Sequence, residues 1–193
     1  MTSSPVSRRA ARAVGTLLLA ASLSVTVTGS APASSMLGMD LEMLSASADR
    51  ILVGKVEKTE SRFLSQTRKY IVTDVTVVSE RQLLGASASS RVVIRQLGGT
   101  VGKLGQRVFG EASYRVGERV LVFAVKRQGV FYTLGMQQGV LHIHADERGV
   151  ARIRSVPLKA ELLGPASVVS EQGRKLEDVI SRVRSLVARR ARR

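Results

Sequence analysis

The sequence predicts a mainly β protein, a small antiparallel barrel of five or six strands in which an OB-like arrangement is one option. Short β-branched runs alternate with glycine turns between residues 50 and 145, as in small barrels and sandwiches. The chain has no cysteine, so no disulfide can stabilise a small core. Closing the sheet would remove its exposed edges, and a barrel is therefore favoured over a sandwich.

The strands are predicted from their apolar patterns. Polar and apolar residues alternate from Lys69 to Ser79, which gives one buried face. Residues 120–125 are apolar throughout, which suits a central strand covered on both faces. Gly54 predicts a bulge inside its strand, and Gln128-Gly129 predicts a hairpin turn. The predicted strands are 51–56, 69–79, 91–97, 120–125, 130–136, 140–145 and an edge strand at 150–154, with 130–136 pairing with 140–145 and a polar connection at 59–68.

Residues 97–110 hold five glycines in fourteen positions. A phosphate-binding loop would need glycine at position 97 and serine or threonine at 104, but both are leucine. We therefore expect these glycines to turn a barrel corner between two strands. A ligand of this loop would contact Lys103 and Arg107.

Two helices are predicted outside the barrel. Leu37, Leu41, Leu44 and Ala48 form a stripe at helical spacing, which predicts a short amphipathic helix over residues 37–48. Residues 156–173 contain two prolines and are expected to be a linker. Residues 174–193 predict a second amphipathic helix, with acidic residues at its start and arginines at its end, the order that a helix dipole favours.

The N-terminus has the features of a secretory signal peptide. Three arginines precede an uncharged apolar run at residues 13–27, and Ala31 and Ala33 fit a small-x-small cleavage site. We expect residues 1–33 to be the signal, cleaved near Ala33, with an uncleaved anchor as the alternative. The remaining domain would be residues 34–155, and the protein would be periplasmic, on the outer surface, or secreted.

The net charge of +15 favours contact with polyanions. Removing the signal takes away three arginines and no acidic residue, which leaves +12. Composition and solubility alone are the competing explanation. The terminal helix can pack on the barrel, lie on anionic lipid, or bind a partner protein. The candidate polyanion or partner contacts are Arg182, Arg184, Arg189, Arg190, Arg192, Arg193, Lys103 and Arg107.

Catalytic and metal-binding motifs are sparse. The sequence has neither a G-x-S-x-G elbow nor an H-E-x-x-H motif, and we expect no cofactor. His142 and His144 lie two apart on a predicted strand, so both project from one face. Asp146 or Glu147 would have to complete a metal site there. The competing interpretation is that both histidines lie on the outer surface of the strand.

A set of short motifs resembles a loosely defined group of uncharacterised exported bacterial proteins that carry one small β domain. The motifs are Ala48-Asp49, Val53-Gly54-Lys55-Val56, Leu84-Gly85, Leu97-Gly98-Gly99, Gly117-Glu118, Val122-Phe123 and Gln138-Gly139. The resemblance spans roughly residues 40–145 and implies a β fold outside the cytoplasm. It transfers no function and no site residue.

The sequence thus favours an exported, non-catalytic binding or scaffolding domain of the cell envelope that contacts polyanions or protein partners. One alternative is a metal-dependent or hydrolytic enzyme that uses His142 and His144. The other is an OB-like module that binds nucleic acid, which export and the low aromatic content of 4% make less favourable.

Overall fold

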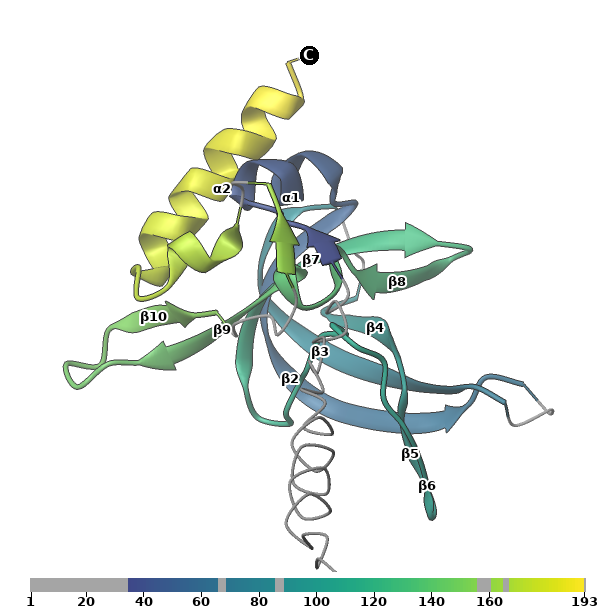
Figure 1. The fold of residues 1–193 in the computed structure, drawn as a ribbon. Coiled ribbons are helices and arrows are strands. Elements are labelled where there is room, and N and C mark those ends of the chain that lie inside the picture. Colours follow the sequence, from purple (N-terminus) through teal and green to yellow (C-terminus); the bar gives the residue numbers. More distant parts are fainter. Residues whose placement is uncertain (1–34, 66–68, 86–88, 156–160, 165–166, 193) are drawn as a thin grey trace, which may run out of the picture. The chain divides into compact units, whose positions relative to one another are not determined.

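The structure is a computed structural model that describes residues 35–65, 69–85, 89–155, 161–164 and 167–192. All of these belong to one compact unit, Ala33–Arg193. The predicted signal peptide, residues 1–33, lies outside the described residues. The fold is mainly β, as predicted, with a multi-stranded sheet and a C-terminal helix (Figure 1).

The main sheet has seven strands in the order β10-β9-β7-β2-β3-β4-β8, and β7 also pairs with β8. Every pairing is antiparallel except that of β4 with β8, which is parallel. The seven strands are β2 (Arg50–Phe63), β3 (Ile71–Leu84), β4 (Arg91–Leu97), β7 (Arg119–Arg127), β8 (Val130–Thr133), β9 (Val140–Ala145) and β10 (Ala151–Arg154).

The first two long strands extend further than the sequence predicted. The predicted connection at residues 59–68 is strand as far as Phe63, which pairs with Ile71 at the start of β3. The polar residues of this stretch are tolerated because most of their side chains are exposed. The predicted bulge is confirmed, since the register between β2 and β3 shifts between Val53 and Gly54.

The predicted pairing of residues 130–136 with 140–145 is wrong. β8 and β9 instead lie along the same edge of β7, with β9 on its residues 119–122 and β8 on its residues 124–127. Gly135 and Met136 both have positive φ angles, +63° and +57°, which end the extended chain. The 3-10 helix η1 (Met136–Gly139) then leads into β9. The predicted hairpin is confirmed, with φ of +48° at Gln128 and +83° at Gly129.

The glycine-rich stretch forms a hairpin of its own, where the sequence predicted only a corner. Its strands are β5 (Gly99–Val101) and β6 (Leu104–Gln106). Gly99 has φ +135°, and a Cβ there would collide with the hydroxyls of Ser61 and Thr73. Glycine is therefore required where the hairpin crosses the long strands. A further small sheet pairs β1 (Ser35–Leu37) in parallel with β11 (Glu161–Leu163).

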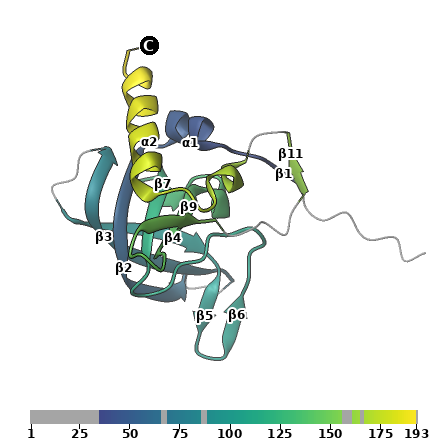
Figure 2. The ribbon, with the colours of Figure 1, turned by 90° about the vertical axis from the view of Figure 1, so that its left-hand side faces the viewer.

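Two α-helices lie at one end of the sheet, and the β5–β6 hairpin projects from the opposite end (Figures 1 and 2). Where the sequence predicted a helix over 37–48, the structure has only the seven residues of α1 (Leu41–Ser47), because Asp40 accepts a hydrogen bond from Met43 N and caps it. Within the predicted linker, the described residues include β11 and the 3-10 helix η2 (Val168–Glu171). The predicted C-terminal helix is α2 (Leu176–Arg190).

Among the described helices, none is long and apolar enough to cross a membrane.

The core has two parts, separated by β2 and β7. One part lies between these strands and the helices and includes Ile51 of β2 and Phe123 of β7. The other lies on the opposite face of the same strands, which there contribute Leu52 and Val122. Residues 120–124 are completely buried, which confirms that β7 is covered on both faces.

Candidate functional site

A pocket of about 500 Å³ opens where the β5–β6 hairpin leaves the sheet. Its wall combines the backbone of the glycine-rich stretch with side chains from β3, from β4 and from the segment before β7. The lining residues are Thr73, Gln96, Leu97, Gly98, Gly99, Thr100, Gly105, Gln106, Arg107, Val108, Glu111, Ala112, Ser113 and Tyr114. We call this site the glycine pocket.

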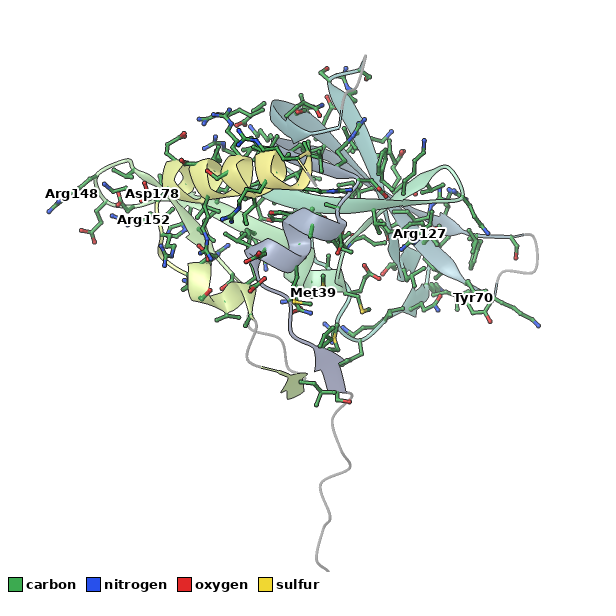
Figure 3. All side chains as sticks on the ribbon, turned by 90° about the horizontal axis from the view of Figure 1, so that it is seen from above. Met39, Tyr70, Arg127, Arg148, Arg152 and Asp178 are labelled. Atoms are coloured by element: carbon green, nitrogen blue, oxygen red, sulfur yellow. The ribbon has the colours of Figure 1, made fainter. Side chains whose placement is uncertain are left out.

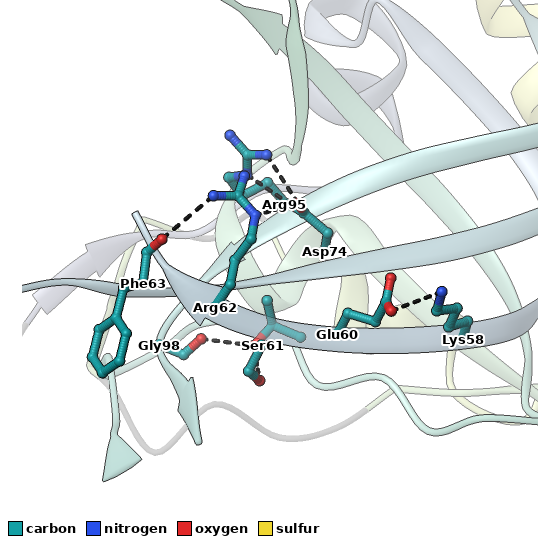
Figure 4. A network of polar contacts seen from close by, with 9 residues as sticks. Lys58, Glu60, Ser61, Arg62, Phe63, Asp74, Arg95 and Gly98 are labelled. Carbon is teal, nitrogen blue, oxygen red and sulfur yellow. Dashed lines mark hydrogen bonds and ion pairs between the residues drawn. The ribbon is translucent and has the colours of Figure 1, made fainter. Parts of the chain in front are cut away.

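Hydrogen bonds between β2, β3 and the hairpin fix one wall of the glycine pocket. The hydroxyls of Ser61 and Thr73 lie 2.9 Å apart, and Thr73 Oγ1 donates to the carbonyl of Gly98 at 2.7 Å (Figure 4). Gln106 Oε1 accepts from the backbone N–H of Ile71 at 2.6 Å. These contacts hold the hairpin against the long strands, so the glycine backbone has a defined position.

Neutral polar side chains line the inner part of the pocket. Gln96 is buried and its Nε2 donates to the carbonyl of Ala112. Tyr114 is buried, and its hydroxyl lies 2.7 Å from Thr133 Oγ1. Burial raises the pKa of Tyr114, so its hydroxyl stays neutral at physiological pH.

Glu111 supplies the one carboxyl group among the lining residues. Burial raises its pKa above the ordinary value of 4.5, and hydrogen bonds from the backbone N–H groups of Leu97 and Ala112 oppose that shift. A raised pKa lessens the negative charge that the pocket wall carries at mildly acidic pH. An anionic ligand is then repelled less at this wall.

The structure separates the two basic residues that the sequence analysis assigned to this loop. Arg107 lines the pocket, while Lys103 lies in the turn of the hairpin and does not. Both are exposed, and within the described part of the chain neither takes part in an ion pair. Arg107 is therefore available to a bound anion.

The outer face of β2, β3 and β4 carries a set of charges that is separate from the pocket, because its side chains point away from the face of Thr73 and Gln96. Asp74 of β3 lies between Arg62 of β2 and Arg95 of β4 and pairs with both (Figure 4). Tyr70, the residue before β3, is 59% exposed. Tyr70 and Arg127 lie far from Arg148 in the molecule (Figure 3).

The apolar stripe of α2 packs on the domain, which confirms the first of the three predicted roles. Leu176, Val179, Ile180, Val183 and Leu186 are all buried. Because these side chains are in the core, the arginine face is what α2 presents to solvent.

The candidate arginines of α2 divide into two groups. Arg182 Nη1 binds the buried carboxylate of Glu171 at 2.8 Å, and Arg190 Nη1 donates to the carbonyl of Ala48 at 2.6 Å. These two residues stabilise the fold. All five candidates that the structure describes are exposed, but Arg184, Arg189 and Arg192 take part in none of the ion pairs of the described residues. Arg193 lies outside the described residues.

The two histidines differ in environment, and the prediction that both lie at the surface is wrong for His142. His142 is 4% exposed, and its Nδ1 lies 2.8 Å from Glu118 Oε1, outside the angular range of a hydrogen bond. His144 is exposed. His142 is buried because its part of β9 pairs with the central strand β7, whereas His144 lies beyond that pairing. The sequence signal for the burial of His142 was its position on the same strand face as Val140, which is also buried.

The predicted metal ligands are not brought together. Asp146 accepts hydrogen bonds from the backbone N–H groups of Arg148 and Val150 and from the side chain of Arg152. It therefore closes the β9–β10 turn. Across the residues that the structure describes, no three histidine, aspartate or glutamate side chains are grouped to hold a metal ion.

Comparison with known proteins gives no relative for this chain. No family model, no curated protein sequence and no solved structure matches it. The resemblance to exported bacterial β-domain proteins stays a prediction.

Proposed function

We propose that this chain is an exported, non-catalytic binding domain of the cell envelope, with strands arranged as in an OB fold. Its glycine pocket would take a segment of an acidic polysaccharide. The observation that carries this proposal is the pocket itself, about 500 Å³ in volume, where β3 begins and β4 ends, with Arg107 in its wall.

The strand pairings support an OB-type barrel. Each of β2, β3, β4, β8 and β7 pairs with two others of the five, in the cycle β2-β3-β4-β8-β7-β2. The parallel pair is the third strand with the fifth along the chain. OB folds bind oligosaccharides and oligonucleotides on the face of their second and third strands and on the loops between strands 1 and 2 and between strands 4 and 5. The corresponding strands here are β3 and β4, which contribute Thr73, Gln96 and Leu97 to the pocket, and the rest of its wall comes from the connection between β4 and β7.

The chemistry of the wall favours a sugar polymer over a nucleic acid. The exposed hydroxyl groups of Thr100 and Ser113 match the hydroxyls of a sugar ring, and Arg107 matches a carboxylate or sulfate. Single-stranded nucleic acids are bound largely by stacking on exposed aromatic rings. The aromatic side chain in the pocket wall, Tyr114, is buried. Single-stranded nucleic acid is therefore the competing ligand in the test of this proposal.

The test is calorimetric titration of the purified chain with an acidic oligosaccharide such as oligogalacturonate. We expect binding that weakens as salt rises, with no binding of a neutral dextran oligomer of similar length. Tighter binding of single-stranded DNA than of the oligosaccharide would contradict the assigned ligand class.

A pair of variants locates the site. Arg107→Gln and Arg148→Gln each remove one positive charge, but Arg148 lies in the β9–β10 turn, outside the pocket lining. One ionic contact is worth on the order of 1 kcal/mol, so Arg107→Gln should weaken binding about fivefold. Arg148→Gln should leave it unchanged. Equal weakening by both variants would mean that the net charge, and not the pocket, attracts the ligand.

A further inference from the structure

Three methionine side chains, none of which lines the glycine pocket, lie beside two glycines at the surface. Met36 lies in β1, Met39 lies between β1 and α1, and Met136 opens η1. Met36 and Met136 meet at Gly110, and Met39 lies at Gly135, the residue before Met136. All three methionines are partly exposed, so a solute can reach them. We call this group the methionine cluster.

Two of the sulfur atoms lie close together at Gly110, and the third lies beside Gly135. The Cβ position of Gly110 is 3.1 Å from Met36 Sδ and 3.7 Å from Met136 Sδ. Those two sulfurs are therefore separated by no more than the sum of these distances, 6.8 Å. Met39 Sδ lies 2.6 Å from the Cβ position of Gly135, the residue next to Met136. A side chain at either glycine would occupy the space beside the sulfurs.

Hydrogen bonds fix the relative positions of the three segments that carry these methionines. The buried side chain of Gln138 accepts from Met39 N at 2.7 Å and donates to the carbonyl of Leu37 at 3.0 Å. Gln137 N donates to the carbonyl of Gly110 at 2.9 Å. Because Gln137 and Gln138 follow Met136 directly, these bonds fix its backbone relative to those of Met36 and Met39.

The chemistry of the cluster selects a narrow class of ligand. Thioether sulfur is a soft donor that binds Cu(I) and disfavours hard cations such as Mg²⁺ and Ca²⁺. Methionine has three rotatable side-chain bonds, so sulfurs a few ångströms apart can close on one ion. The chain has no cysteine to compete for it. We propose that Met36, Met39 and Met136 form a binding site for a soft monovalent cation, Cu(I) or Ag(I).

The primary test is NMR of the full chain carrying 13C-labelled methionine methyl groups, titrated with Ag(I), an air-stable soft cation. We expect the methyl signals of Met36, Met39 and Met136 to shift together and to saturate at one equivalent. The signal of Met43 should not move. Shifts confined to Met43, or no shift at all, would overturn the proposal.

Competition with a chromogenic Cu(I) chelator under reducing conditions gives the second readout. The triple variant Met36→Leu, Met39→Leu and Met136→Leu should lose Cu(I) binding, and each single variant should weaken it at least about tenfold. Met43→Leu is the matched control and should bind as the parent does. Leucine conserves volume, so each substitution should cost less than about 1.5 kcal/mol of stability. Unchanged Cu(I) affinity in a triple variant with a parental circular dichroism spectrum would refute the site.

Discussion

Arg95 binds Asp74 through two parallel hydrogen bonds across adjacent strands, from Nε to Oδ1 at 2.7 Å and from Nη2 to Oδ2 at 3.0 Å. Arg62 reaches the same carboxylate from the other side, with its Nε 3.2 Å from Oδ2. One carboxylate therefore links three neighbouring strands, β2, β3 and β4, on the face opposite to the one on which Thr73 and Gln96 line the glycine pocket.

Asp74→Asn should destabilise the fold in a way that depends on pH. The hydrogen bond from Arg95, and then its charge and that of Arg62, lower the pKa of Asp74 below the ordinary value of 3.8. A lowered pKa contributes stability that is present above 3.8 and lost as pH falls through the lowered pKa. At pH 7 the variant should lose about 1–2 kcal/mol in urea unfolding.

The difference between parent and Asp74→Asn should shrink as pH falls below 3.8. The control is Glu147→Gln, at an exposed turn position, which should have no such effect. A constant difference between pH 7 and pH 2 would show that the carboxylate charge is not responsible.

Glu111→Gln should have the opposite pH dependence. Burial raises the pKa of Glu111, so the folded protein holds this proton to higher pH than the unfolded chain does. The neutral carboxyl is favourable below the ordinary value of 4.5, and that stability is lost as pH rises through the raised pKa. At pH 7 the glutamine variant should therefore be at least as stable as the parent, with a flatter stability profile between pH 4 and pH 7.

Thermal unfolding across this pH range measures the effect of Glu111→Gln. Loss of stability at pH 7 would mean that the ionised carboxylate is needed, for example by a charge partner in the pocket. Glu147→Gln again serves as the exposed control.

Much of the β domain could be predicted from local pattern. The strand at 91–97 has the bounds that were predicted, and the wholly apolar run at 120–125 is the central strand. The amphipathic period of residues 176–187 gave α2, because helix periodicity and burial of one stripe go together.

The features that the sequence did not predict depend on contacts between distant residues. The β5–β6 hairpin has no apolar alternation, and its position depends on Ser61 and Thr73, which come much earlier in the chain. The shared edge of β7 was missed because strand order is not encoded in any local pattern. The burial of His142 likewise depends on its pairing with Val120 of β7. Arg107 was selected from the sequence, whereas Gln96 and Glu111 were not, because nothing local placed them beside it.

Arg190→Met should destabilise the contact between the two helices. Arg190 donates from Nη1 to the carbonyl of Ala48 at 2.6 Å, at the C-terminal end of α1, where carbonyls lack helical partners. Methionine retains an apolar stem but no donor, so we expect a loss of about 1 kcal/mol in the free energy of unfolding. Arg189→Met removes the same charge from the neighbouring, exposed position and should cost less. Equal losses of stability in the two variants would mean that the removed charge, and not the hydrogen bond to Ala48, causes the effect.

Gly54→Ala should strongly destabilise the sheet, in contrast to Gly105→Ala. A Cβ at Gly54 would collide with the carbonyl oxygen of Val78 and lie 2.7 Å from Val77 Cγ1, whereas the nearest atom to a Cβ at Gly105 is 3.8 Å away. We expect a loss of about 2–3 kcal/mol for Gly54→Ala by denaturant unfolding. A loss under about 0.5 kcal/mol is expected for Gly105→Ala. Similar values for both variants would contradict the close packing of β2 on β3.

The most direct test of the proposed function is to map an acidic oligosaccharide onto the chain by backbone amide NMR. We predict perturbations centred on Gly98, Gly99 and Arg107, with the amides of Arg184, Arg189 and Arg192 unaffected. Perturbations confined to those α2 arginines would place the polyanion contact on the terminal helix and contradict a binding site in the glycine pocket.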